Sequence, residues 1–153
     1  MLNIQGHTED VVALAIHPTQ NQFVSGGCDK MIHLWDTMSH LVVWSKDIAE
    51  SAQSAAFSPD GNILIVSTTI PGKWMILDAT TRQLISIHND GMDIIEYIKF
   101  SPNGNYLSLA SRDKCVYIYQ ITEEFRKFNR IGRCAGHSSY VTAIGKYIYC
   151  LYY

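Results

Sequence analysis

The chain has 153 residues, enough for one domain with a sizeable buried core. Hydrophobic residues make up 47% and charged residues 17%, which is typical of a globular protein and not of a disordered one. The net charge of -2 excludes a strong basic field that would draw the chain to nucleic acid or to an anionic membrane. The apolar runs are too short to span a bilayer, and we recognise no signal peptide.

The four cysteines are Cys28, Cys115, Cys134 and Cys150, and none form a Cys-x-x-Cys pair. Reduced thiols in a cytosolic protein are the natural interpretation. The cysteines and the six histidines also lack the close spacing of a zinc site. We therefore expect neither a metal nor another cofactor.

A period of about 42 residues organises the chain. Each unit has a proline-containing turn after its first apolar run, and the prolines lie 41 and 43 residues apart, at Pro18, Pro59 and Pro102. Each unit also ends its third run at a recurring position, in Trp35-Asp36, Leu77-Asp78 and Tyr119-Gln120. Strands that alternate with turns at such a period predict propeller blades of four strands each.

Three units follow this pattern, and each is expected to contain four strands. The strands are predicted at 11–16, 22–26, 31–35 and 41–45, then at 54–57, 63–67, 74–77 and 84–88, and finally at 97–100, 106–110, 116–119 and 130–134. The connection over 122–129 is predicted to be a long charged loop. No convincing helix is found.

The blades are expected over about 7–47, 50–88 and 92–135, with the first strand of a fourth blade at 136–144 and a divergent tail at 145–153. The fold class is therefore an all-β partial propeller, with three blades plus one strand. Closed propellers use four to eight blades. We accordingly expect a fragment, a truncated isoform or an incomplete gene model.

The first unit resembles a WD repeat, because it runs from Gly-His to Trp-Asp at this period. In that family a His, a strand hydroxyl, a turn Asp and a Trp form a buried hydrogen-bonded set, which is matched here by His7, Ser25, Asp29 and Trp35. Each buried polar group in such a set gains a partner. We predict this network in the first blade and mainly apolar packing in the others.

The same His7, Ser25 and Asp29 also have the composition of a catalytic triad. A hydrolase needs an exposed nucleophile beside an oxyanion site. The spacing instead matches the network inside a blade, so we expect a structural role and no enzyme.

Longer strings narrow the resemblance, at 7–11, 14–18, 72–74, 77–82, 85–91 and 132–142. They resemble the C-terminal propeller of the echinoderm microtubule-associated protein-like (EMAP-like) family, over nearly the whole chain up to Ile144. The resemblance implies a non-catalytic cytoskeletal interaction module that binds tubulin or microtubules in the cytoplasm. The alternative is a general WD-repeat scaffold for another assembly, such as a ligase adaptor or a trafficking complex.

A basic stretch is the candidate partner-binding surface. It contains Arg126, Lys127, Arg130 and Arg133, with an aromatic residue among them. Lys and Arg steer an acidic partner, and the acidic tails of tubulin are such a partner. Because acidic residues lie beside the stretch, a merely solvated loop is the alternative.

Overall fold

Twelve β-strands form three four-stranded antiparallel sheets in the part of the chain that the structure describes, and that part contains no helix. The structure is a computed structural model, and it describes residues 6–90, 92–122, 127–139, 141 and 144. The predicted all-β fold, a partial propeller with three four-stranded blades, is confirmed. Within these ranges no helix is long and apolar enough to cross a membrane.

Each sheet is one blade, and its four strands follow one another in chain order. The first blade contains β1 (Val11–Ile16), β2 (Gln22–Gly27), β3 (Met31–Asp36) and β4 (Val42–Asp47). The second contains β5 (Ala52–Phe57), β6 (Ile63–Thr68), β7 (Lys73–Asp78) and β8 (Leu84–Asn89). The third contains β9 (Ile95–Phe100), β10 (Tyr106–Ser111), β11 (Cys115–Thr122) and β12 (Lys127–Ala135).

Side-chain caps shape the turn between the first two strands of the second and third blades. Asp60 accepts hydrogen bonds from the Ser58 hydroxyl at 2.5 Å and from the Asn62 backbone at 3.1 Å. In the third blade the Ser101 hydroxyl donates to Oδ1 of Asn103 at 2.7 Å. The side chain two residues after Ser thus closes both turns, as Asp and Asn do in turn motifs.

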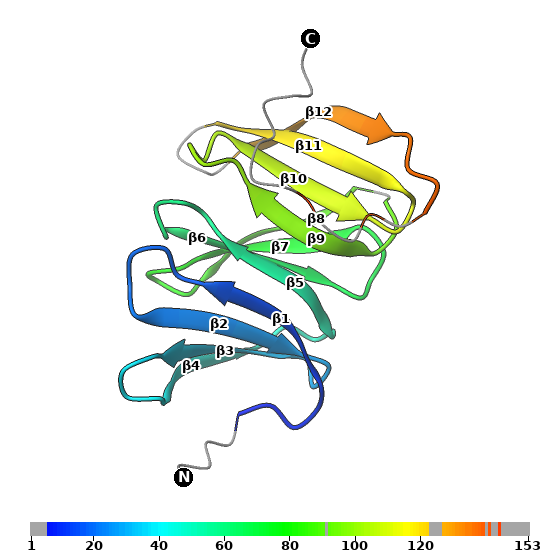
Figure 1. Ribbon diagram of the computed structural model, residues 1–153. Coiled ribbons are helices and arrows are strands. Elements are labelled where there is room, and N and C mark those ends of the chain that lie inside the picture. Colours follow the sequence, from blue (N-terminus) through cyan, green and yellow to red (C-terminus); the bar gives the residue numbers. More distant parts are fainter. Residues whose placement is uncertain (1–5, 91, 123–126, 140, 142–143, 145–153) are drawn as a thin grey trace.

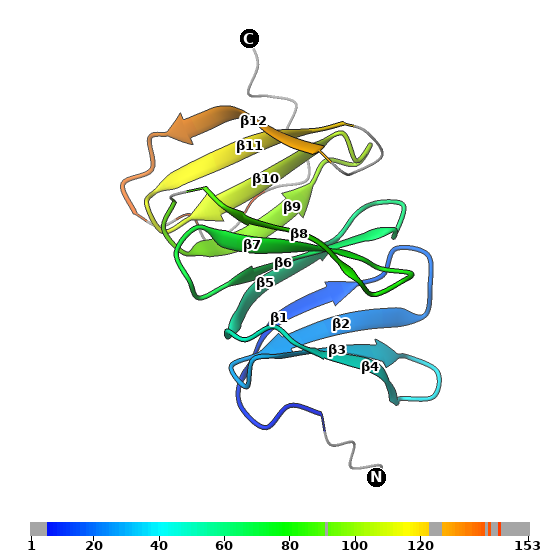
Figure 2. The same cartoon turned by 180° about the vertical axis from the view of Figure 1, so that it is seen from behind.

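The blades are stacked in chain order, as Figures 1 and 2 show. The innermost strands are neighbours, because β1 contacts β5 and β5 contacts β9. By strand order, β4, β8 and β12 lie at the opposite edges of their sheets. One side of the molecule is therefore a wall of inner strands, and the other carries the outer strands.

The hydrophobic core lies between neighbouring blades. Two clusters of buried side chains fill these spaces, and each cluster combines residues from the facing sheets of two neighbouring blades. The first cluster joins blades one and two and includes Val24, Ile32, Leu34, Leu64, Val66 and Leu77. The second joins blades two and three and includes Ile65, Trp74, Ile76, Leu107, Leu109 and Tyr119. Strands β6, β7, β10 and β11 are accordingly buried on both faces, as their near-continuous apolar sequences require.

The predicted loop over 122–129 is wrong in its extent. Strand β11 continues to Thr122, and β12 already begins at Lys127, with these two residues paired. Phe128 explains the added pairing, because its ring packs 5.5 Å from the Trp74 ring and 6.0 Å from the His88 ring. The contact of Phe128 with the second blade thus holds the start of β12 in the sheet of the third blade.

The predicted first strand of a fourth blade lies partly outside the described residues, which lack 140, 142 and 143. Val141 is described and is buried, with 5% of its surface exposed. It packs on Ala110, Val116 and Ile118, on the face of the third blade that points away from the second. The position suits a further blade, but the strand itself stays a prediction.

Candidate functional site

The structure brings together the four polar residues singled out in the first blade. His7 precedes β1, Ser25 lies on β2, Asp29 is in the β2–β3 turn and Trp35 is on β3. The Trp35 indole N–H donates to Ser25 Oγ at 2.7 Å, and Ser25 Oγ lies 2.7 Å from His7 Nε2. His7 Nδ1 lies 2.9 Å and 3.0 Å from the two carboxylate oxygens of Asp29.

These contacts form one chain of donors that ends on a carboxylate. With the proton of His7 on Nδ1, the indole donates to the hydroxyl, the hydroxyl to Nε2, and Nδ1–H to Asp29. Backbone N–H groups of Thr8 and Met31 also donate to Asp29. Burial by itself would raise the pKa of Asp29, but the His7 hydrogen bond and the two backbone donors lower it below its usual value. The ionised form of Asp29 is thus the stable one at neutral pH.

The geometry of this set suits a structural role better than catalysis. Ser25 is only 4% exposed, and its hydroxyl oxygen is engaged by both Trp35 and His7. A nucleophilic serine must instead reach a substrate carbonyl next to an oxyanion site. The arrangement ties the entry of β1 to the β2–β3 turn of the same blade.

A second histidine, His33 on β3, lies beside the network and was not singled out from the sequence. Its ring centre is 4.4 Å from that of His7, and its Nδ1 lies 2.7 Å from Ser45 Oγ. Its Nε2 is the one buried side-chain nitrogen or oxygen without a hydrogen-bond partner among the described residues. Burial lowers the pKa of His33, and so does the nearby His7; the Asp29 charge and the Gly6 carbonyl act in the opposite direction without reversing the shift.

Asp90 joins the second and third blades, which sequence reasoning missed. Its Oδ2 accepts from the Trp74 indole N–H at 3.0 Å and from the Tyr119 hydroxyl at 2.6 Å. Trp74 is fully buried and Tyr119 is 2% exposed, so both donors depend on this carboxylate. Burial, and then Asp90 itself, raise the pKa of Tyr119 well above its usual value.

The third blade has its own polar contact, because the Tyr117 hydroxyl donates to the Asp113 carboxylate in the β10–β11 turn. Tyr117 faces the second blade, in the same cluster as Trp74. The expectation that the second and third blades depend mainly on apolar packing is therefore incomplete. Both blades contain buried aromatic donors that end on a carboxylate, built from residues other than those of a complete WD repeat.

The basic stretch lies mostly on a strand and not in a loop. Lys127, Arg130 and Arg133 are exposed on β12, the outermost strand of the third blade. Arg126, the fourth basic residue of the stretch, lies outside the described residues. The Arg130 guanidinium lies 5.7 Å from the centre of the Tyr117 ring. Arg130 and Arg133 pair with Tyr119 and Tyr117 and lie on the face of β12 that points to the second blade, whereas Lys127 pairs with Thr122 and lies on the other face. We name these three exposed basic residues the β12 row.

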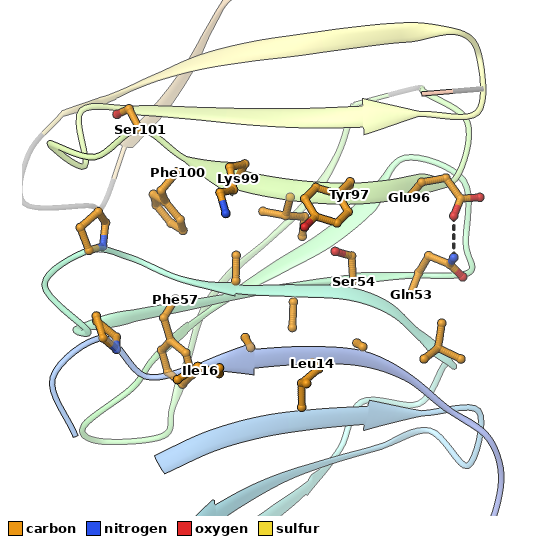
Figure 3. Close-up of a pocket in the computed structure, with 18 of the residues that line it drawn as sticks. Leu14, Ile16, Gln53, Ser54, Phe57, Glu96, Tyr97, Lys99, Phe100 and Ser101 are labelled. Carbon is orange, nitrogen blue, oxygen red and sulfur yellow. Dashed lines mark hydrogen bonds between the residues drawn. The ribbon is translucent and has the colours of Figure 1, made fainter. Parts of the chain in front are cut away.

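A second surface feature is an open groove of about 830 Å³ along the inner strands β1, β5 and β9 (Figure 3). Leu14 and Ile16 line it and are 61% and 74% exposed. At one end Gln53 Nε2 donates to Glu96 Oε2 at 2.8 Å, as the dashed line in Figure 3 shows, and Lys99 and Ser101 lie toward the other end. Exposed aliphatic side chains of this kind favour contact with another protein surface.

Comparison with known proteins gives the family. Residues 11–145 match the family described as the echinoderm microtubule-associated protein second beta-propeller. Echinoderm microtubule-associated protein-like 2 of Rattus norvegicus is 47% identical over 141 residues, which is 92% of this chain and 22% of that protein.

Two further relatives agree. Echinoderm microtubule-associated protein-like 1 of Mus musculus is 43% identical over 138 residues, covering 90% of this chain and 17% of the relative. The 77 kDa echinoderm microtubule-associated protein of Strongylocentrotus purpuratus is 43% identical over 141 residues, covering 92% of this chain and 20% of the relative. The chain thus spans about a fifth of the length of the relatives it matches, and it belongs to the echinoderm microtubule-associated protein family, in the region of the second propeller.

Proposed function

We propose that this chain is a non-catalytic interaction module of a cytoplasmic, cytoskeletal protein, and that it binds tubulin or microtubules. The relatives carry the name of microtubule-associated proteins, and the family match covers residues 11–145. The buried, fully engaged Ser25 supports a role without catalysis.

The observation that carries the proposal is the β12 row. Lys127, Arg130 and Arg133 are exposed on the outermost strand of a blade whose inner strands are packed. Phe128 packs the start of the same strand against Trp74 on the second blade. The acidic tails of tubulin are complementary to such a row, and pairing of exposed charges speeds association and weakens with salt.

Co-sedimentation with microtubules tests this proposal. Reversing two charges of the row, in a Lys127→Glu/Arg130→Glu variant, should weaken binding by at least about tenfold at low salt, because each exposed charge contributes to a screened attraction. A Lys30→Glu/Lys46→Glu variant makes the same change of net charge on the first blade and should bind like the unaltered chain. Equal binding by all three proteins would refute the role of the row.

The inner-strand groove supports a second candidate, a general scaffold for another protein assembly. Its exposed Leu14 and Ile16 suit an apolar segment of a partner and not a polyanion. Binding to an acidic carrier protein serves as the control for charge alone. A chain that pellets with microtubules no better than it binds the carrier would favour this second candidate.

A further inference from the structure

Three potential metal ligands meet in the first blade, at the side of the polar network. Each of the three residues, His7, Asp29 and His33, offers one ligand atom, and these three atoms lie within 4.8 Å of one another. All three are well buried, since the His7 and Asp29 side chains are 4% and 6% exposed and His33 is 7% exposed. Two imidazoles and one carboxylate are a donor set that suits zinc and neighbouring transition metals.

The unpartnered nitrogen of His33 is the independent sign of a ligand. Nδ1 lies 2.7 Å from Ser45 Oγ, and a proton on Nδ1 donated to that oxygen leaves a lone pair on Nε2. That lone pair is buried and receives no hydrogen bond. Histidines that bind metals typically donate their other ring N–H in this way, which fixes the ring and its tautomer.

We propose that His7 Nδ1, Asp29 and His33 Nε2 bind one divalent transition-metal ion, with Zn²⁺ as the best match. This inference is independent of microtubule binding. Three protein ligands leave a fourth position for water, as in zinc sites that keep an open position. Bonds of about 2.1 Å place tetrahedral ligands roughly 3.4 Å apart, so the three atoms need to shift by about 1 Å or less.

The protons balance without an additional acid or base. In the metal-free network the proton of His7 lies on Nδ1 and points at Asp29. When the ion binds, it takes this place, and His7 carries its proton on Nε2 and donates it to Ser25 Oγ. Ser25 Oγ then accepts from both His7 and Trp35 with its two lone pairs, and its own hydrogen rotates away.

The surroundings support the ligands and give the ion a route. Asp29 is held by the backbone N–H groups of Thr8 and Met31, at 2.9 Å and 3.1 Å, which leave lone pairs for an ion. A groove of about 690 Å³ passes over the His7 and Trp35 side chains and opens to solvent. The groove therefore reaches one ligand of the site directly.

Titration of the full, chelator-stripped chain with Zn²⁺ alone tests the proposal, with a zinc-sensitive dye as competitor. We expect one Zn²⁺ per chain and a higher melting temperature with the ion. Long-range ¹H–¹⁵N spectra should show the change in chemical shift at His33 Nε2. Absence of stoichiometric binding, or binding that leaves the His33 nitrogens unchanged, would overturn the proposal.

Variants locate the ion. His33→Gln removes a ligand but no member of the Trp35–Ser25–His7 chain, and it should weaken binding by more than tenfold. Ser45→Ala removes only the partner of Nδ1 and should weaken binding by about tenfold, as for other residues that orient a ligand. His40→Gln changes an exposed histidine at the same groove and should leave affinity unchanged. Equal affinities for His33→Gln and the unaltered chain would contradict the site.

Discussion

Asp90 is the carboxylate that two buried aromatic donors share, so its removal should destabilise the junction of the second and third blades. Trp74 and Tyr119 each donate to Oδ2, at 3.0 Å and 2.6 Å. Hydrogen bonds to a charged group contribute about 1.5–3 kcal/mol each, and Asp90 is half-buried, so water replaces part of the loss. We expect Asp90→Ala to lower the free energy of unfolding by about 2–4 kcal/mol.

Urea denaturation followed by tryptophan fluorescence measures this loss, and Tyr119→Phe supplies the matched control. The Phe variant keeps the ring in the core and the Trp74 contact, so it should cost only about 1–2 kcal/mol. Because both changes remove the same bond, the double variant should show a coupling of about 1 kcal/mol or more. A loss below about 0.5 kcal/mol for Asp90→Ala, or no coupling, would refute the shared-acceptor account.

Three further changes test other parts of the fold. Ser25→Ala leaves the Trp35 indole N–H without its acceptor and should cost about 1–3 kcal/mol in urea denaturation, and a neutral result would contradict the network. Gly26→Ala places a Cβ 2.6 Å from the Ala52 Cβ between two blades and should cost about 1–3 kcal/mol, whereas an unchanged melting temperature would show that the junction yields. Asp60→Asn tests acid sensitivity: burial would raise the pKa of Asp60, but hydrogen bonds led by that from Ser58 lower it overall. The ionised Asp60 carboxylate therefore stabilises the fold fully above its unfolded-state pKa of about 3.9, and this stabilisation disappears as the pH falls through its lower folded-state pKa. The urea midpoints of the unaltered chain and of the Asp60→Asn variant should accordingly converge at acid pH. A constant difference in midpoint from pH 7 to pH 2.5 would contradict that sign.

The strands could be predicted because each apolar run is bounded by a strong turn signal. The two central strands of every blade are largely buried, and the turns that bound the strands carry Pro, Gly, Asp or Asn. The outermost strands are more exposed than the central ones, so burial constrains their sequences less. For β12 the decisive residue is Phe128, whose contact with Trp74 lies across two blades and leaves no pattern in the local sequence.

The polar groups likewise divide into those that the sequence predicts and those that only the structure reveals. His7, Ser25, Asp29 and Trp35 were recognised because a WD repeat fixes their spacing. Asp90 was not, because an Asp followed by Gly resembles an ordinary turn, and its partner Tyr119 belongs to the next repeat. His33 sits in an apolar strand, and only its position beside His7 and Asp29 reveals a set of ligands.

Binding to microtubules with and without their acidic tails tests the central claim most directly. Proteolysis removes the tails while the polymer remains, so the two polymers differ in the charge that the β12 row of Lys127, Arg130 and Arg133 is proposed to meet. The account predicts salt-sensitive co-sedimentation of the chain with intact microtubules and a loss of at least about tenfold in affinity on tail-less ones. Equal affinity for both polymers, or no binding to either, would contradict it.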